Sequence, residues 1–326
     1  MDAPRSCWVV TDGAPGNENQ AVALARALGA APQLIRIDLR WPWRWLAPTG
    51  PLDVRHALLH PHEFPDGADR PELAIGCGRA GALVVRALHS GSAGRTRTVQ
   101  ILDPRRHRGD FDVLVVPSHD RLQGDNVVAC DGSLNSVDDA WLAQGRLRFP
   151  QFEALPSPRT AVLLGGPVRG VRFDHAHVDR LLERLDAWHA RDGGSFLVTC
   201  TRRTPSLVAA RMQAFLDTRP GVLWRPGDSG PNPYAGLLGW ADRIVVTPDS
   251  ANLMSEACAT GTPVLALEPG AVKGKLGRFA AGLIASGRMR ELGVPYHGWR
   301  YAPLREVERV AQLVRSRLDQ LGGPAF

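Results

Sequence analysis

The sequence predicts an α/β protein with two Rossmann-like domains that face a cleft. Short β-branched runs alternate with segments of helical character along the chain, and this alternation is typical of parallel sheets covered by helices. The chain has 326 residues, which suits two domains better than one. Residues 145–158 are rich in Pro and polar side chains without a clear period, so we expect a linker there, between domains at 1–150 and 151–303. A cleft between two such domains is a favoured position for a ligand.

The first half of the chain shows this alternation clearly. Apolar runs are followed by polar, glycine-bearing loops, such as TDGAPGNENQ after the first run and GCGRAG after the third. Gly29 closes the first helix, as glycine often does at a helix C-terminus. We expect strands at 7–10, 34–37, 73–75, 99–102, 113–116 and 127–129, and helices at 21–28 and 82–88.

The second half repeats the same organisation. Residues 174–190 form an amphipathic helix, and residues 222–224 precede a long loop rich in Gly and Pro. We expect strands at 161–164, 195–199, 222–224 and 244–246, and helices at 174–190, after Thr204, at 276–285 and at 304–321.

The most informative stretch is 245–267, VVTPDSANLMSEACATGTPVLAL, which has the pattern of strand, loop, helix, turn and strand. Thr247 to Ser250 interrupt the first strand and offer caps for the helix, and Gly261 ends that helix. In open α/β sheets, ligands bind beyond the carboxyl ends of strands and near helix N-termini. An ordinary, well-capped βαβ unit would show the same pattern. The polar side chains at this position are those of Asp249, Ser250, Asn252, Ser255 and Glu256.

Two other loops of the second half also follow predicted strands. GGPVRG places Gly165, Gly166 and Gly170 where backbone N–H groups can approach an anion. TRRTP places Arg202 and Arg203 where paired guanidinium groups can hold a diphosphate. Taken alone, the second motif also fits a solvated basic turn. The shared position at strand carboxyl ends predicts an anion site in the second domain.

Composition and charge narrow the class of protein. Hydrophobic residues make up 44% of the chain and charged residues 22%, as in ordinary globular proteins. Arginine supplies nearly all of the positive charge behind the net value of +6, and an arginine-rich surface suits phosphates, nucleic acid or an anionic membrane. No helix-turn-helix, zinc-finger or RNP-like pattern supports nucleic acid as a partner. The five cysteines lack metal-ligand spacing and no signal-peptide pattern is present, so we expect a cytoplasmic protein.

Six motifs resemble those of the domain family named for mitochondrial fission, which includes the plant elongated-mitochondria proteins and many bacterial relatives. They are, in the family's order, TDGAPGNENQ, GCGRAG, DPRRHRGDFDVLVVPSHD, GGPVRG, TRRTP and TPDSANLMSEACATGTPV. The resemblance covers nearly the whole chain. That family is similar to GT-B glycosyltransferases, which implies a nucleotide sugar bound mainly by the C-terminal domain. It also implies a final helix, 304–321, that crosses back to the first domain. The family name records a plant phenotype and assigns this chain no mitochondrial role.

The resemblance implies a role for each loop of the second domain. The acidic residue that holds the donor ribose maps onto Glu256, with Ser250 and Ser255 beside it towards the phosphates. The loop from Gly165 to Gly170 would lie under the diphosphate, next to Arg202 or Arg203. The implied donor is a nucleoside diphosphate sugar, with no cofactor and no metal. GT-B enzymes usually stabilise the leaving diphosphate with helix N-termini and cationic side chains instead.

The first domain departs from the GT-B enzyme that makes lipid II. In that enzyme the loop after the first strand holds a catalytic His, and Asn17 occupies the matching position here. Asp12 and Glu18 are the nearby carboxylates and thus the candidate bases, although Asp12 also fits a plain loop cap. The residues that we place on the acceptor side are Asn17, Gly78, Arg79, His119 and Asp120, of which the last two are the alternative source of a base.

The function implied is transfer of a sugar from a nucleoside diphosphate sugar to a lipid-linked or envelope glycan acceptor. Two alternatives stay open. One is a nucleotide-sugar epimerase or hydrolase on the same fold, with a closed acceptor side. The other is a non-catalytic scaffold that retains the fold. The missing His favours the scaffold, whereas the retained glycine loop, both arginines and Glu256 oppose it.

The segment LRWPWRWLAP places Trp41, Trp43 and Trp45 around Arg40 and Arg44. Trp prefers the membrane interface, and Arg is attracted to anionic lipid. The segment therefore predicts peripheral attachment to the inner face of the cytoplasmic membrane, where a lipid-linked acceptor would be found. The alternative is that the three rings pack onto the core of the first domain.

Overall fold

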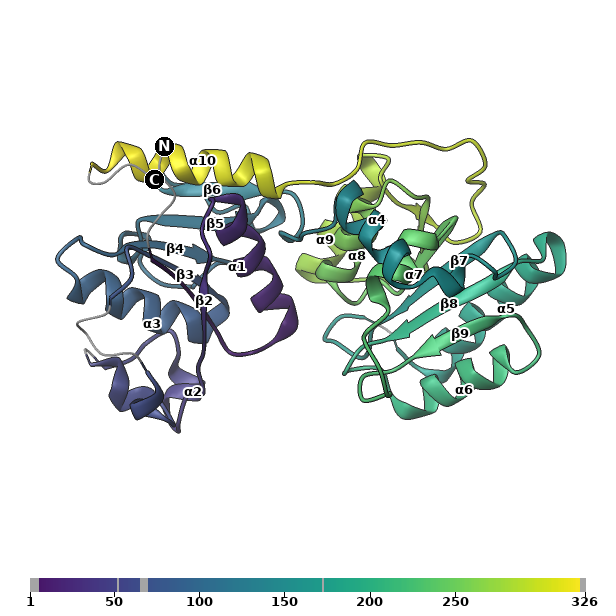
Figure 1. Ribbon diagram of the computed structural model, residues 1–326, viewed down its shortest axis with the longest axis horizontal. Coiled ribbons are helices and arrows are strands. Elements are labelled where there is room, and N and C mark those ends of the chain that lie inside the picture. The colour runs from purple at the N-terminus through teal and green to yellow at the C-terminus, as the bar shows by residue number, and fades with distance from the viewer. Residues whose placement is uncertain (1–5, 52, 65–69, 172, 323–326) are drawn as a thin grey trace. The chain divides into compact units, whose positions relative to one another are not determined.

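The computed structural model describes residues 6–51, 53–64, 70–171 and 173–322. The chain divides into two compact units, one made of Met1–Ser136 with Glu306–Phe326 and the other of Val137–Arg305. Each unit contains one six-stranded sheet whose neighbouring strands all run parallel (Figure 1). The predicted α/β fold with Rossmann-like sheets is therefore confirmed.

The sheet of the first unit has the strand order β2-β1-β3-β4-β5-β6. Its strands are β1 (Cys7–Thr11), β2 (Gln33–Arg36), β3 (Leu73–Cys77), β4 (Arg97–Ile101), β5 (Val113–Pro117) and β6 (Val127–Cys130). Its helices are α1 (Pro15–Ala27), α2 (Trp43–Leu46), α3 (Gly78–Gly91) and α10 (Val307–Gln320). Figure 1 shows α10 in yellow beside α1, in agreement with the packing of these two helices.

Both faces of this sheet are covered, and successive residues of a strand face opposite sides. Val9 of β1 belongs to the core shared with α1 and α10, whereas its neighbours Trp8 and Val10 belong to the core shared with α3. All residues of β1, β3 and β5 are buried. This double burial explains why the strands appear in the sequence as continuous apolar runs.

The sheet of the second unit has the strand order β12-β11-β10-β7-β8-β9. Its strands are β7 (Arg159–Leu164), β8 (Ser195–Cys200), β9 (Gly221–Trp224), β10 (Arg243–Val246), β11 (Val264–Ala266) and β12 (Arg290–Glu291). Its helices are α4 (Asp139–Arg148), α5 (His175–Asp192), α6 (Ser206–Leu216), α7 (Tyr234–Trp240), α8 (Ala251–Ala259) and α9 (Gly274–Ala285). One core contains residues of α5 and α6, and the other contains residues of α4, α7, α8 and α9.

Each sheet contains one point at which the strand order reverses. In the first unit the chain adds β2 on one side of β1 and then β3 on the other side. In the second unit it adds β8 and β9 on one side of β7 and then β10 on the other. Ligands of doubly wound sheets bind beyond the carboxyl ends of the strands at such switch points. The strand order therefore places the candidate ligand sites beyond the carboxyl ends of β1 and β3 in the first unit, and beyond those of β7 and β10 in the second.

The structure differs from the sequence-based expectation at the start of α1. The helix was expected to begin at residue 21, but it begins at Pro15. Proline is well tolerated in the first turn of a helix, where its missing N–H would have had no intrahelical acceptor. Part of the polar loop TDGAPGNENQ is therefore helical.

The expected linker at 145–158 is also wrong. Residues up to Arg148 belong to α4, and Phe152 in the following turn is buried. Helix α4 packs on α7, and Gly145 lies directly against Ala235. The sequence did not predict α7, because the segment around α7 is rich in Gly and Pro. The compact units accordingly divide between Ser136 and Val137, before α4, and not at residue 150.

The contact of α4 with α7 generates a prediction for stability. A methyl group in Gly145→Ala would overlap the carbonyl oxygen of Ala235, so the two helices would have to separate. We expect the free energy of unfolding to fall by about 1–3 kcal/mol, the usual cost of overpacking. In the control Gly282→Ala on α9 the new methyl group meets no atom within 4 Å. Because Ala favours a helix over Gly by roughly 1 kcal/mol, this control should be at least as stable as the parent. Equal urea-unfolding midpoints for the two variants would contradict the packing of α4 on α7.

Candidate functional site

A buried carboxylate joins three loops at the carboxyl edge of the second sheet. Asp249 follows β10, and its side chain is fully buried. Its Oδ2 accepts hydrogen bonds from the N–H of Gly166 at 2.8 Å and from Arg203 at 3.0 Å. Its Oδ1 accepts the hydroxyl of Thr247 at 2.6 Å, and Thr247 Oγ1 accepts the N–H of Gly165 at 2.8 Å. The loops after β7, β8 and β10 are thus connected at the switch point.

This network explains the two adjacent glycines. A Cβ at Gly165 would overlap the carboxylate of Asp249, and a Cβ at Gly166 would overlap the carbonyl group of Arg203. Both glycine N–H groups are already donated within the loops. These two N–H groups therefore stabilise the loops, and an anion bound here would need other hydrogen-bond donors. Further along the loop, Gly170 has a left-handed backbone with φ of 86°, and its carbonyl accepts the N–H of Lys273 at 3.0 Å.

The two neighbouring arginines have different surroundings. Arg203 pairs with Asp249. Burial raises the pKa of Asp249, and the Thr247 hydroxyl, the Gly166 N–H and the charge of Arg203 oppose this rise. Arg202 is exposed to solvent. Within the described part of the chain, no carboxylate forms an ion pair with Arg202. Arg202 is therefore the cation of this pair that a bound phosphate can reach without breaking an internal contact.

The polar residues at the start of α8 support the helix itself. The side chain of Ser250 caps the helix and accepts the N–H of Leu253 at 3.3 Å. Ser255 is buried, and its hydroxyl donates to the carbonyl oxygen of Ala251 at 2.7 Å. Both serine hydroxyls thus form hydrogen bonds with backbone groups of the helix.

Glu256 on α8 is a half-buried carboxyl group in contact with α7. The hydroxyl of Tyr234 donates a hydrogen bond to Glu256 Oε2 at 2.7 Å. Burial raises the pKa of Glu256 to about 7, although the bond from Tyr234 opposes this shift. The pKa of Tyr234 is also raised, first by burial and then by the charge of Glu256. Sequence reasoning missed Tyr234 because it lies in a Gly- and Pro-rich region without a recognisable motif.

A second group at this edge was also missed. Glu268 follows β11 and has a left-handed backbone, with φ of 47°, which is unusual for a residue other than glycine. Its carboxylate accepts a hydrogen bond from Arg180 at 3.0 Å, and its Oε2 lies 3.5 Å from Nδ1 of the buried His177. Burial lowers the pKa of His177, whereas Glu268 opposes that change. The only signal in the sequence was the turn-forming Pro-Gly pair after Glu268.

At the switch point of the first unit, three of the predicted residues come together. Asp12 follows β1, and its Oδ1 accepts hydrogen bonds from the N–H of Ala14 at 3.1 Å and from the amide of Asn17 at 3.0 Å. Asn17 also lies against Gly78, the first residue of α3, where a Cβ would approach the Asn17 amide nitrogen to 2.8 Å. Gly78 has φ of 75°, so both its conformation and its contact with Asn17 favour glycine.

Glu18 is engaged in an ion pair. Arg36 donates two hydrogen bonds to its carboxylate, each 2.9 Å long. The Arg36 guanidinium lowers the pKa of Glu18. Proton uptake by Glu18 would weaken this ion pair, so Asp12 is the better candidate base of the two.

The other residues expected on the acceptor side do not join this group. Arg79 donates to the carbonyl oxygens of Trp45 at 2.6 Å and Ala47 at 2.7 Å, so it holds the tryptophan-rich segment. His119 and Asp120 follow β5, with their Nε2 and Oδ1 atoms 3.7 Å apart. Strands β3 and β4 separate β5 from β1. At about 4.8 Å per strand, this pair lies roughly 14 Å along the sheet edge from Asp12.

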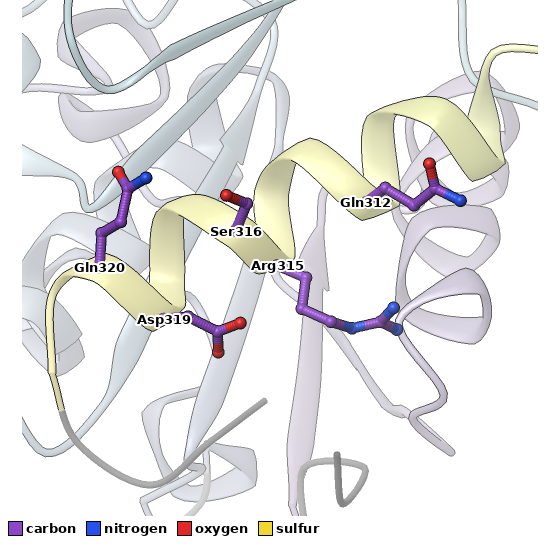
Figure 2. Close-up of a pocket in the computed structure, with 5 residues that line it drawn as sticks. All are labelled: Gln312, Arg315, Ser316, Asp319 and Gln320. Atoms are coloured by element: carbon purple, nitrogen blue, oxygen red, sulfur yellow. The ribbon is translucent and has the colours of Figure 1, made fainter.

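Polar side chains on α10 line a shallow hollow that is separate from the switch point of the first unit. Figure 2 shows them on successive turns of this one helix, with Arg315 and Asp319 pointing to one side and Ser316 and Gln320 to the other. The five residues are Gln312, Arg315, Ser316, Asp319 and Gln320. Because α10 covers a face of the sheet and not its carboxyl edge, we assign no site to this hollow. Among the described residues, no three His, Cys, Asp or Glu side chains are arranged to hold a metal ion.

Known proteins resemble this chain in sequence or in fold. The family described as Mitochondrial fission ELM1 matches residues 15–318. The mitochondrial fission protein ELM1 of Arabidopsis thaliana is 28% identical, over 98% of this chain and 92% of the plant protein. The UDP-GlcNAc 2-epimerase of Neisseria meningitidis, solved bound to UDP-GlcNAc, has a TM-score of 0.55 at 12% identity, covering 97% of this chain and 100% of the epimerase. Os79 from O. sativa, solved in complex with UDP, has a TM-score of 0.53 at 13% identity, covering 96% and 91%.

At such low identities the solved structures show the fold alone, and that fold is of the GT-B type. The sequence match is of a different kind, because it covers residues 15–318, from the start of α1 into α10. The chain therefore belongs to the mitochondrial fission ELM1 family.

Proposed function

We propose that this protein is a cytoplasmic glycosyltransferase that moves a sugar from a nucleoside diphosphate sugar to a lipid-linked or envelope glycan acceptor. The observation that carries this proposal is the position of the polar residues. In each unit they gather beyond the carboxyl ends of the two strands that flank the switch point, where doubly wound folds bind ligands. Proteins of the same fold have been solved with UDP-GlcNAc or UDP, which supports a uridine diphosphate sugar as donor.

The second unit would bind the donor. Glu256 would accept hydrogen bonds from the ribose hydroxyls in its ionised form, which a pKa of about 7 makes the major form only above neutral pH. The diphosphate would lie at the N-terminus of α8, where backbone N–H groups carry partial positive charge, with exposed Arg202 beside it. These groups would also stabilise the charge of the leaving diphosphate, so the transfer would require no metal. The bonds of Asp249 would hold the surrounding loops in position.

The first unit would supply the base. Asp12 would take the proton of the acceptor hydroxyl while the acceptor oxygen bonds to the anomeric carbon and the bond from that carbon to the diphosphate breaks. Asn17 donates to one oxygen of Asp12, which orients the carboxylate and leaves its other oxygen for the acceptor.

A second candidate is a nucleotide-sugar epimerase. It is supported by several solved UDP-GlcNAc 2-epimerases of the same fold. A non-catalytic scaffold is supported by the ion pair that occupies Glu18. An assay with radiolabelled UDP-GlcNAc and a bacterial lipid extract separates the three functions. Transfer to lipid supports the glycosyltransferase, isomerisation without lipid supports the epimerase, and binding without turnover supports the scaffold.

The raised pKa of Glu256 predicts how donor binding depends on pH. The ionised fraction of a group with a pKa of about 7 grows between pH 6 and 8, and the ionised form accepts hydrogen bonds more strongly. Affinity for UDP-GlcNAc, whose diphosphate does not titrate in this range, should therefore rise over this interval and then level off. Glu256→Gln should lower the affinity at pH 8 about tenfold, as for one lost bond to a charged group, and remove the pH dependence. Calorimetry at three pH values measures both effects. The control is Glu183→Gln, at an exposed carboxylate on α5. A Glu256→Gln variant that binds like the parent would remove this residue from the donor site.

The two arginines should differ in what they stabilise. Arg202→Gln should weaken UDP-GlcNAc binding by about 1.5–3 kcal/mol, as expected for a lost charge-assisted bond, and leave uridine binding unchanged. Arg203→Gln should instead lower the free energy of unfolding by roughly 1–3 kcal/mol, because the buried Asp249 loses its cation. Calorimetry with both ligands and urea unfolding distinguish these effects. If Arg202→Gln weakened the binding of uridine and of UDP-GlcNAc equally, Arg202 would not be a phosphate ligand.

The surroundings of Asp12 and Glu18 predict unequal effects on turnover. In the lipid-extract assay, Asp12→Asn should bind UDP-GlcNAc normally and transfer the sugar at least ~100-fold more slowly, because the general base is lost. Glu18→Gln is the matched control and should keep most of the activity, since Glu18 is already paired with Arg36. Full activity of Asp12→Asn would direct the search for the base to His119 and Asp120.

A further inference from the structure

Two of the three clustered tryptophans are exposed. Trp41 has 80% of its surface accessible and Trp45 has 76%, although Trp is normally well buried. Leu46 beside them is also exposed. Trp43, by contrast, packs against the core of the first unit that contains residues of α3. The alternative that the three rings pack onto the core of the first domain therefore holds for Trp43 alone. We call Arg40, Trp41, Arg44, Trp45 and Leu46 the tryptophan surface.

The charge of the tryptophan surface is positive. Arg40 and Arg44 are both exposed, and residues 39–52 contain neither Asp nor Glu. Asp38 and Asp53 flank this segment, and the Asp53 side chain accepts the N–H of Arg55. Within the described ranges, no acidic side chain forms an ion pair with Arg40 or Arg44. Aromatic rings between unpaired cations match the interface of an anionic bilayer, which has both an apolar layer and negative headgroups.

Arg79 fixes the tryptophan surface to the rest of the first unit. It is the second residue of α3, and its guanidinium donates to the carbonyl oxygens of Trp45 and Ala47. Gly78, just before it, contacts Asn17 at the switch point. The surface is thus held by the same helix N-terminus that borders the candidate acceptor site. A pre-ordered surface loses little conformational entropy on docking.

We propose that the tryptophan surface docks this protein on an anionic phospholipid bilayer, with Arg79 as the positioning residue. The rings of Trp41 and Trp45 enter the headgroup region, and Arg40 and Arg44 bind the lipid phosphates. The attachment is peripheral, and among the described residues no helix combines the length and the apolar character needed to cross a bilayer. The docking places Asp12 and Asn17 of the same unit near lipid-linked molecules. It requires neither donor binding nor sugar transfer, so it can be tested separately from the proposed reaction.

The test is sedimentation with vesicles that contain phosphatidylglycerol and phosphatidylcholine, compared with vesicles of phosphatidylcholine alone. The parent should bind the anionic vesicles at low salt. Trp41→Ser/Trp45→Ser should abolish binding without changing the melting temperature, since both rings are exposed. Arg40→Gln/Arg44→Gln should weaken it by about fivefold per charge. The matched control is Leu147→Ser/Leu207→Ser, which removes exposed apolar side chains of the second unit and should bind like the parent.

The role of Arg79 is tested in the same assay. Lys keeps the charge but cannot donate to two carbonyl groups in the fork geometry of Arg. Arg79→Lys and Arg79→Gln should therefore weaken vesicle binding to a similar extent, while calorimetry with UDP-GlcNAc stays unchanged. If Arg79→Lys kept vesicle binding and Arg79→Gln lost it, Arg79 would contribute its charge and would not be a positioning residue.

Three results would overturn the docking proposal. One is absence of binding to anionic vesicles at low salt, and another is equal loss of binding in the Leu147→Ser/Leu207→Ser control. The third is a dimer in light scattering that the Trp41→Ser/Trp45→Ser variant converts to a monomer, because the surface would then bind a second copy of the chain. Quenching of tryptophan fluorescence by brominated lipid, lost in that same variant, would support insertion of these two rings.

Discussion

The buried charge of Asp249 determines the geometry of the second unit's carboxyl edge. Burial disfavours the ionised form, and the Thr247 hydroxyl, the Gly166 N–H and Arg203 favour it. Removing any of these donors would leave a buried polar group unsatisfied, at a cost of about 1–3 kcal/mol or more. The loops after β7, β8 and β10 are therefore coupled, and none can shift without disturbing the others. The adjacent glycines follow from the same contact, because a side chain at either position would displace the carboxylate or the loop that carries Arg203.

The fold could be predicted because its signals are local. Strands buried on both faces appear as short apolar runs, and helix 174–190 shows its period without any tertiary contact, so both matched the structure within a few residues. The error at the expected linker arose because a distant contact determines the structure there. Helix α4 lacks a clear period, and it is stabilised by α7, against which Gly145 packs. No pattern in either segment reveals that the other is its partner.

The location of the candidate sites was predictable, but their internal bonds were not. Any residue just after a strand must lie at the carboxyl edge of a parallel sheet, so the loops with Gly165, Arg202 and Asp249 were recognised together. Arg202 and Arg203 look equivalent in sequence, yet only Arg203 reaches Asp249. Glu256 and its donor Tyr234 come from different helices, and Arg36 reaches Glu18 from the neighbouring strand. Such pairings depend on three-dimensional distance, which the spacing along the chain does not give.

Two carboxyl groups at the switch point of the second unit differ in how they are satisfied, and this difference bears on function. Asp249 has a full set of donors, as a structural group should. Glu256 accepts its hydrogen bond from the Tyr234 hydroxyl and forms no ion pair in the described part of the chain, and burial raises its pKa to about 7. A protein selected only for its fold gains little from such a group, because an apolar residue of similar size would avoid the desolvation cost. Perturbed carboxyl groups of this kind concentrate where ligands bind. The arrangement around Glu256 therefore favours a ligand-binding role for the second unit over a purely structural one.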